Sequence, residues 1–293
     1  MNPDLVDLPG LRAFLVAHAV PGLDDVVALD DRSTRHRRLV RTPTGTLVTL
    51  TAVLPPGVVG TPVVVAEGPP DAVAAAAVLG RRWLGLDADP GSGVDALADD
   101  PVLGPLVTSR PHLRVPGSTD PFETAVLVVL GQQVSLAAGQ LFAARLVAAH
   151  GSAPEAAPLR AFPSPEVLAA LDTVALQRAL GITGARARTI VVLARAVAEG
   201  AIRLEATSTG AVERAGTREA LLALPGIGPW TADLVALRAL RDPDVFLAGD
   251  LVLRRALGGV SAAQAATASD AWRPHRSLAV LHLWTQHAID PPR

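Results

Sequence analysis

The stretch that decides the fold is TREALLALPGIGPWTADLVALRAL, residues 217–240. A helical pattern ends at residues 224–225, a Gly-Ile-Gly turn follows at 226–228, and Pro229 can start a second helix, because proline suits the first helical position. Glycines without a Cβ let backbone N–H groups approach an anion, and the second helix aims its positive end at the same point. A bare GxG is usually an ordinary tight turn, but the full string between two helices predicts a hairpin that holds a phosphate.

A single carboxylate follows this hairpin at a fixed distance. Asp250 lies twenty residues past Trp230, between VFLAG and LVLRRAL, where another helix is expected to begin. Taken alone, an aspartate at a helix start is an N-cap residue. Its position after the hairpin makes it the candidate catalytic group.

The composition predicts a multidomain globular protein and excludes several chemistries. The chain has 293 residues, of which 49% are hydrophobic and 18% charged, enough for two or three domains with a real core. It contains no cysteine, which excludes disulfides, thiolate zinc sites and a cysteine nucleophile. It also contains no lysine, which excludes a lysine Schiff base.

The charge distribution does not by itself point to nucleic acid. Residues 1–115 hold 10 Arg and 13 acidic residues, and residues 116–293 hold 16 Arg and 15 acidic residues, so neither part has a strong basic excess. Any contact with DNA must therefore rely on local geometry such as the hairpin. The first residues carry no export signal and no segment reaches 18 continuous apolar residues, so we expect a soluble, cytoplasmic protein.

The pattern of expected elements changes along the chain. The first third reads as a helix at 10–20, a β-hairpin at 36–53, a strand at 61–66 and a helix at 70–84. From Asp120 onward almost every signal is helical: Asp120 is an expected N-cap with Pro121 and Glu123 after it, and Ser135 an expected second cap. This predicts a mainly α protein with an N-terminal α+β domain.

Several ordered motifs resemble the helix–hairpin–helix base-excision glycosylases, and within them the DNA-3-methyladenine glycosylase II (AlkA-like) family. The motifs are LRAFLVAHAV (11–20), VPGSTDPFETAVLVVLGQQVS (115–135), FPSPE (162–166), LGITGARARTI (180–190), LPGIGPWTAD (224–233), PDVFLAGD (243–250) and WRPHRSLAVLHLW (272–284). The resemblance implies a TATA-binding-protein-like N-terminal domain at 1–96 and a two-lobed all-helical glycosylase region at 97–293. The hairpin lobe would span 121–242, and the second lobe would combine 97–120 with 243–293.

The resemblance also implies roles for individual residues. Asp250 matches the catalytic aspartate, and Trp230 and Trp284 match positions that line the base pocket, although either could simply pack in the core. Leu234 stands in the same pocket where the family pattern has tyrosine. Gln133 matches the residue that fills the gap in the duplex. In close members of the family this position resembles a leucine.

The remaining implied site residues surround the hairpin. The DNA-binding residues would be Pro225, Gly226, Ile227, Gly228 and Thr231. Backbone carbonyls of Leu222, Leu224 and Ile227 match positions that hold a structural monovalent cation. No other cofactor is expected.

Together these features predict a monofunctional glycosylase that flips alkylated purines, such as 3-methyladenine and 7-methylguanine, out of duplex DNA and hydrolyses the N-glycosidic bond. The expected partner is double-stranded DNA with alkylated bases, with no membrane, and the resemblance implies a monomer. Three alternatives stay open: a glycosylase for deaminated or oxidised bases, a non-catalytic protein that binds damaged DNA, and, with less support, a small-molecule enzyme.

Overall fold

The computed structural model describes residues 4–29, 32–154, 157–204 and 210–289. The N-terminal part holds an antiparallel sheet in the order β2-β3-β4-β6, formed by β2 (Asp24–Ala28), β3 (Thr34–Arg41), β4 (Leu47–Leu54) and β6 (Val63–Glu67). A separate short pair joins β1 (Val6–Asp7) to β5 (Val59–Gly60). The expected hairpin at 36–53 is therefore present as β3 and β4, whereas β2 was not expected.

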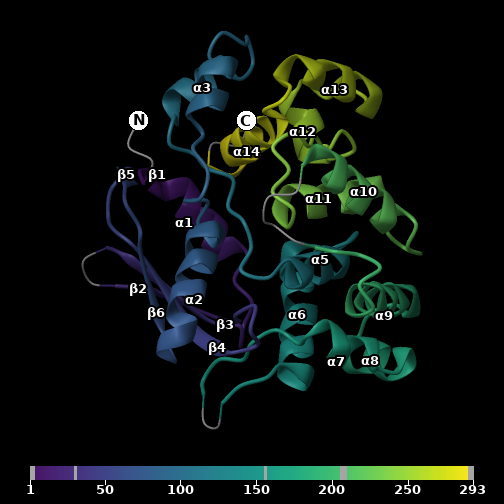
Figure 1. Cartoon of the computed structure of the whole chain (residues 1–293). Coiled ribbons are helices and arrows are strands. Elements are labelled where there is room, and N and C mark those ends of the chain that lie inside the picture. The colour runs from purple at the N-terminus through teal and green to yellow at the C-terminus, as the bar shows by residue number, and fades with distance from the viewer. Residues whose placement is uncertain (1–3, 30–31, 155–156, 205–209, 290–293) are drawn as a thin grey trace.

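Alternation along the strands decides how the sheet is covered. Every second residue of β4 is buried, which is the pattern of a strand with one face on a core. Helix α2 (Pro70–Trp83) packs on β4 and β6, and Figure 1 shows it lying across the sheet, with α1 (Leu8–Ala17) nearby. Ala72, Ala76 and Leu79 of α2 meet β-strand residues such as Leu50 in one apolar cluster.

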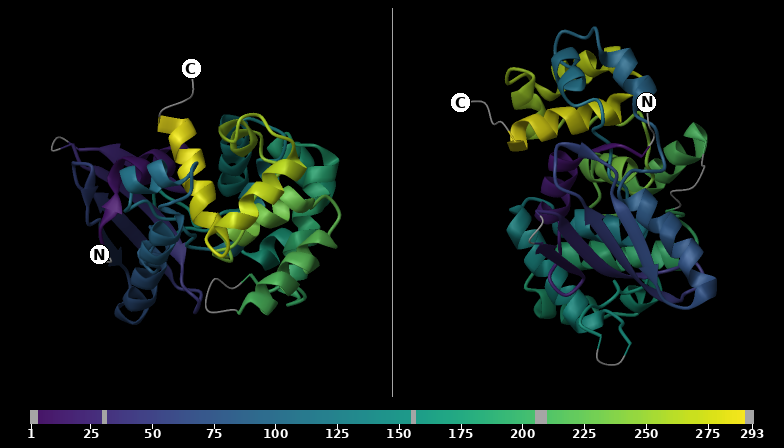
Figure 2. Two further views of the ribbon diagram at one scale, coloured as in Figure 1. Left: turned by 90° about the horizontal axis from the view of Figure 1, so that it is seen from above. Right: turned by 90° about the vertical axis from the view of Figure 1, so that its left-hand side faces the viewer.

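Helices make up the rest of the described chain. They are α3 (Gly91–Leu97), α4 (Gly104–Ser109), α5 (Pro121–Leu130), α6 (Leu136–His150), α7 (Pro165–Ala169), α8 (Thr173–Leu180), α9 (Gly184–Ala198), α10 (Ala211–Leu222), α11 (Pro229–Arg238), α12 (Leu251–Ala256), α13 (Ala262–Ser269), the 3-10 turn Asp270–Trp272 and α14 (Arg276–Ile289). Figure 2 shows the sheet domain on one side, the helices on the other and α14 between them. The prediction of a mainly helical protein with an N-terminal α+β domain is confirmed.

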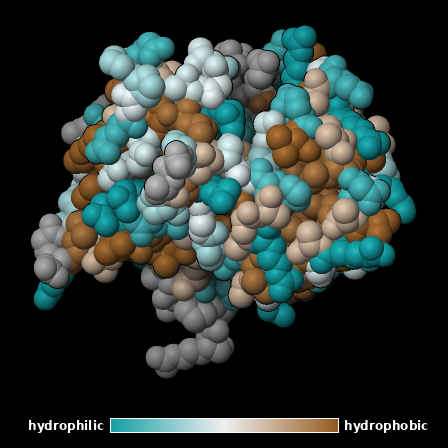
Figure 3. Space-filling view, turned by 90° about the horizontal axis from the view of Figure 1, so that it is seen from below, coloured by the Kyte–Doolittle hydropathy of each residue, from teal (hydrophilic) through white to brown (hydrophobic). Residues whose placement is uncertain are grey.

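Figure 3 shows how hydrophobic and hydrophilic side chains are distributed over one face of the molecule. Hydrophobic side chains gather in separate groups with hydrophilic ones between them on the face seen in Figure 3. Among the described residues, no helix is long and apolar enough to cross a bilayer.

A buried polar cluster ties the sheet domain to the helices. Arg38 of β3 donates to Glu123 of α5 (Nη2–Oε1, 2.6 Å), and its Nε lies 3.4 Å from Asp24 Oδ1. His36 Nε2 contacts the same Asp24 oxygen at 2.8 Å. Asp120 caps α5 as expected, but Glu123 does not return to the cap; it is drawn to Arg38 instead. The cluster thus places two carboxylates around one arginine.

Arg38 stabilises the ionised form of Glu123 less than that of Asp24. Burial raises its pKa to about 7; Arg38 opposes the rise, and the nearby Asp120 and Asp24 add to it. Asp24 has the opposite shift: despite its burial, the charge of Arg38 and the contact with His36 leave its pKa below the usual value. One cation therefore keeps one carboxylate ionised and leaves the other close to protonation at neutral pH.

This arrangement predicts a specific pH dependence of stability. Between pH 4.5 and about 7, folded Glu123 binds a proton that the unfolded chain has released, so the free energy of unfolding falls as pH rises across that window. Glu123→Gln, which is neutral throughout, should remove a fall on the order of 2–3 kcal/mol. Urea unfolding of both proteins at pH 5 and pH 8 measures it. A stability difference between variant and wild type that is equal at both pH values would refute the prediction.

Candidate active site

The two glycines of the hairpin between α10 and α11 have different structural roles. Gly226 has φ +84°, and a Cβ added there would lie 2.0 Å from the Thr189 hydroxyl of α9, so this glycine faces inward. Gly228 has extended backbone, and a Cβ there would meet nothing within 4 Å. The sequence predicts room for an anion at both glycines. The structure leaves the Cβ direction open at Gly228, whereas at Gly226 that direction points at Thr189 of α9.

The start of α11 is open to a ligand. Its N-cap is Gly228, which has no side chain to accept a hydrogen bond, and Pro229 in the first turn has no N–H. The next amides of the turn therefore lack a side-chain cap, and they carry the positive end of the helix dipole. Pro225, Gly226, Gly228 and Pro229 are all exposed around this point, whereas Ile227 is buried in the core.

The side chain of Thr231, one of the residues predicted to bind DNA, is turned inward, and a contact with DNA at this residue stays a prediction. Thr231 is buried, and its hydroxyl accepts a hydrogen bond from Gln132 Nε2 at 2.9 Å. The same Gln132 nitrogen donates to the Gly226 carbonyl at 3.0 Å. Thr231 thus anchors the 131–135 turn to the hairpin. The next residue, Gln133, is exposed and has φ +54°, a conformation uncommon for a residue with a side chain.

Asp250 caps a helix, and its carboxylate also faces a cavity. As the N-cap of α12, its Oδ1 accepts hydrogen bonds from the backbone N–H groups of Val252 (2.9 Å) and Leu253 (3.0 Å). The indole N–H of Trp230 donates to Oδ2 at 3.3 Å, and that of Trp284 donates to Oδ1 at 3.4 Å. These four donors fix the orientation of a carboxylate that remains half-buried and faces a cavity.

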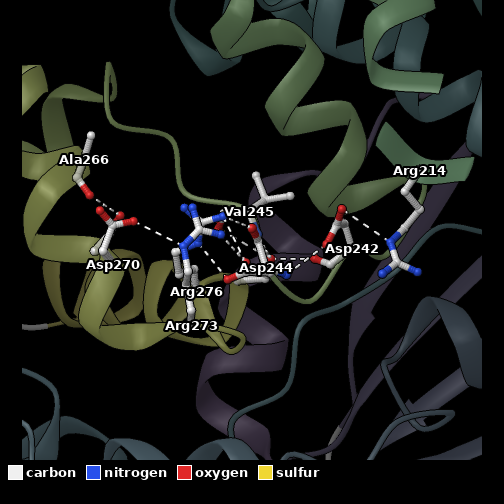
Figure 4. Close-up of polar contacts among 10 residues, drawn as sticks. Arg214, Asp242, Asp244, Val245, Ala266, Asp270, Arg273 and Arg276 are labelled. Carbon is white, nitrogen blue, oxygen red and sulfur yellow. Dashed lines mark hydrogen bonds and ion pairs between the residues drawn. The ribbon is translucent and has the colours of Figure 1, made fainter. Parts of the chain in front are cut away.

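Two sequence motifs meet to hold the segment before Asp250. Asp244, in PDVFLAGD, pairs with Arg273 (2.6 Å) and Arg276 (2.7 Å) of the WRPHRSL stretch. Ser277 accepts the Val245 N–H at 3.0 Å and donates to the Asp242 carbonyl at 2.6 Å. Figure 4 shows Asp244 between Arg273 and Arg276. Asp250 and Trp284 are therefore positioned by the same junction.

The expected pocket residues line one cavity of about 710 Å³. Trp230, Leu234, Asp250 and Trp284 all contribute to its wall. Gln133 does not line the cavity, but its neighbours Gly131 and Val134 do, so Gln133 lies at the rim. The structure thus brings together residues that are more than 150 positions apart in the sequence.

Sequence reasoning missed the opposite wall of this cavity. Phe14 and His18 of α1 and Arg238 at the end of α11 also line it. The quoted motifs LRAFLVAHAV and 217–240 contain all three residues, but nothing in their spacing alone shows that two segments more than 200 residues apart meet. Arg238 could have been found from its eight-residue spacing to Trp230, which places both on one helix face.

The family of the chain follows from its match to known sequence families. Residues 5–120 match the AlkA N-terminal domain, and residues 126–273 match the HhH-GPD superfamily of base excision DNA repair proteins. This chain belongs to the HhH-GPD superfamily. The helix–hairpin–helix expected from residues 217–240 lies within that match.

Individual relatives agree with the family. The chain is 40% identical over 295 residues to a probable bifunctional transcriptional activator/DNA repair enzyme AlkA from Mycobacterium tuberculosis, covering 97% of this chain but 56% of that protein. It is 40% identical over 190 residues to DNA-3-methyladenine glycosylase 2 of Escherichia coli, covering 64% of this chain and 66% of that protein. It therefore spans from about half to two thirds of these two relatives.

Solved structures show the same fold. A 3-methyladenine DNA-glycosylase from Archaeoglobus fulgidus superposes with a TM-score of 0.78 at 23% identity, covering 97% of this chain and 96% of that chain. This likeness extends to the N-terminal sheet as well as the helices.

Metal chemistry at side chains finds no support in the described part of the chain, which holds no group of three or more His, Asp or Glu residues suited to a metal ion. The carbonyl cation site expected at Leu222, Leu224 and Ile227 is of another kind. The Leu224 carbonyl accepts the Ile227 N–H at 3.2 Å, which leaves its second lone pair for a hard cation. The turn is compatible with such a cation, which stays a prediction.

Proposed function

We propose that this protein is a monofunctional DNA glycosylase that hydrolyses the N-glycosidic bond of alkylated purines in duplex DNA. The observation that carries the proposal is the convergence of Asp250, Trp230 and Trp284 on one cavity beside an open helix–hairpin–helix. A protein that only binds DNA needs the hairpin but has no use for a carboxylate held in a cavity by two indoles.

DNA binding would begin at the hairpin. The uncapped start of α11 and the open space at Gly228 suit a backbone phosphate. The target nucleotide would leave the base stack and enter the cavity. Gln133, exposed at the rim on a strained turn, is positioned to fill the gap left in the duplex. A monovalent cation at the turn would add positive charge near that phosphate, and the reaction needs no step through it.

Inside the cavity, Trp230 and Trp284 would bind the base and Asp250 would act at the sugar. Alkylation at a ring nitrogen makes the purine cationic, and the electron-rich faces of Trp230 and Trp284 favour such a base. The cationic base is already a good leaving group, so a strong general acid is unnecessary. Asp250 would stabilise the positive charge that develops on the sugar and orient or deprotonate the attacking water. Because the chain contains no lysine, imine formation by lysine and the strand cleavage that follows it are excluded.

The function is tested by release of free 3-methyladenine and 7-methylguanine from methylated duplex DNA. We also propose that the protein acts on duplex DNA as a monomer and that it does so in the cytoplasm. Free bases measured by chromatography would support hydrolysis, and binding without release would support the alternative of a damage-binding protein.

Gly228→Ala tests the hairpin separately from the chemistry. The added methyl meets no protein atom within 4 Å, so the fold should be unchanged, but it would occupy space that a phosphate needs. We expect duplex affinity to fall about tenfold, equivalent to one lost charge-assisted hydrogen bond. Fluorescence anisotropy with a labelled duplex across a salt titration measures this. Equal affinities for variant and wild type at every salt concentration would show that DNA does not bind at Gly228.

A further inference from the structure

The turn that carries Gln133 joins α5 to α6 and has an unusual backbone conformation. Gln133 has φ +54°, in the left-handed region that a residue with a side chain seldom adopts. Its side chain is exposed at the rim of the cavity. A backbone conformation of this kind persists only where the surrounding structure fixes it. The contacts made by the rest of the turn therefore decide where the Gln133 side chain is directed.

Arg186, in the first turn of α9, makes one of these contacts. Its Nη2 donates a hydrogen bond to the carbonyl of Gln132, which belongs to the peptide group that joins Gln132 to Gln133. A hydrogen bond from a charged donor is stronger than one between neutral groups. The guanidinium carbon also lies 5.8 Å from the centre of the Phe142 ring, so an aromatic side chain supports the guanidinium plane. Arg186 thus fixes the peptide group next to Gln133.

The same helix also holds the hairpin. Thr189 lies one turn further along α9 than Arg186, so both side chains are on one side of the helix. The Thr189 hydroxyl lies 3.0 Å from the Pro225 carbonyl. The Gln132 side chain completes the link, because its Nε2 donates to the Gly226 carbonyl at 3.0 Å. Helix α9 therefore sets the position of the turn relative to the hairpin.

We propose that Arg186 is a positioning residue for base flipping. Through the Gln132 carbonyl it would hold Gln133 at the rim, so that the side chain enters the gap in the duplex while the hairpin holds the backbone phosphate. A group that is already held in position loses less conformational freedom when it binds. Without Arg186 the turn would sample other conformations, and Gln133 would fill the gap less often. The inference rests on the proposed glycosylase function and adds a residue that acts without touching the base.

The experiment is a double-mutant cycle of Arg186→Met and Gln133→Ala. We expect Arg186→Met to lower the single-turnover rate of base release from methylated duplex about tenfold or more, because small displacements of positioning groups have effects of this size. Affinity for an unmodified duplex, to which the hairpin would bind, should stay at the wild-type value. In the Gln133→Ala background, Arg186→Met should cause no further loss, since both changes would remove the same function.

A fluorescence measurement tests the same cycle without catalysis. A duplex with 2-aminopurine beside an abasic-site analogue is saturated with protein, and the change in fluorescence reports whether a side chain has entered the gap and altered the stacking of the probe. We expect the wild type to change the signal. Arg186→Met, Gln133→Ala and the double variant should all lose most of that change.

Arg145→Met is the matched control. Arg145 of α6 also donates to a backbone carbonyl, that of Leu180 at 2.8 Å, but at the end of α8 and away from the turn. This variant should keep the wild-type release rate and fluorescence change. Arg186→Met should fold, because it keeps an aliphatic stem against Phe142 and removes a buried Nε that has no hydrogen-bond partner. Melting temperatures check this, and the cycle is repeated with Arg186→Lys, which keeps the charge and should show a smaller loss of the same kind.

Two different failures can be told apart. Losses from Arg186→Met that are equally large with and without Gln133, or a fluorescence change that Arg186→Met leaves intact, would overturn the positioning role. Absence of base release by the wild type, with its fluorescence change present, would instead overturn the proposed function.

Discussion

Replacing Asp250 by asparagine is expected to lower the rate of base release about a hundredfold or more, the loss seen when one preorganised electrostatic group is removed from an active site. Asparagine keeps the carbonyl oxygen that caps α12 and is as good an N-cap as aspartate, so the fold should persist. What it loses is the negative charge that opposes the cationic sugar. Duplex affinity should be unchanged, because the hairpin is not altered.

Single-turnover release of free base, with excess protein over methylated duplex, measures this effect without the contribution of product release. Asp172→Asn is the matched control: Asp172 caps α8 in the same way, accepting the Ala175 N–H at 2.8 Å, but lies on an exposed turn outside the cavity. Its release rate should equal that of the wild type. Release by Asp250→Asn at the wild-type rate would remove Asp250 from the mechanism.

Gly226→Ala is expected to cause the largest loss of stability among the substitutions considered. The left-handed conformation costs an alanine about 1–2 kcal/mol. The added methyl would also lie 2.0 Å from the Thr189 hydroxyl, and overpacking typically costs about 1–3 kcal/mol more. The total, about 2–5 kcal/mol, would lower the melting temperature by several degrees or more.

Gly228→Ala is the control for this prediction, since the same methyl group two residues away meets no atom of the protein. Thermal and urea unfolding of both variants should show a destabilised Gly226→Ala and a Gly228→Ala close to wild type. Equal stability of the two alanine variants would mean that Gly226 does not pack against α9 as described.

The contrast between these glycines shows how far the sequence predicts the fold. Hydrophobic periodicity and caps predict the β-hairpin and the helices from Asp120 to the hairpin, because those signals are local. Strand β2 was missed because its sequence, DDVVA, opens with two acids. Asp24 is buried only because His36 and Arg38 of the next strand pair with it, and a pairing of that kind has no local signature.

The residues of the site could also be predicted only in part from the sequence. The resemblance placed Asp250, Trp230, Trp284 and Leu234 together, and the structure brings them to one cavity. It could not show that the Thr231 hydroxyl turns inward, since that depends on Gln132, which arrives from a turn almost one hundred residues earlier. Similarly, Phe14 meets Arg238 only because α1 of the sheet domain lies near the end of α11.

The central claim is hydrolysis of the N-glycosidic bond, and one measurement tests it most directly. Methylated duplex DNA is incubated with the purified protein, and released bases and strand breaks are quantified from the same sample. We predict free 3-methyladenine and 7-methylguanine with an intact backbone that breaks only when alkali cleaves the abasic sites. Tight binding to the methylated duplex without release of either base would contradict the account.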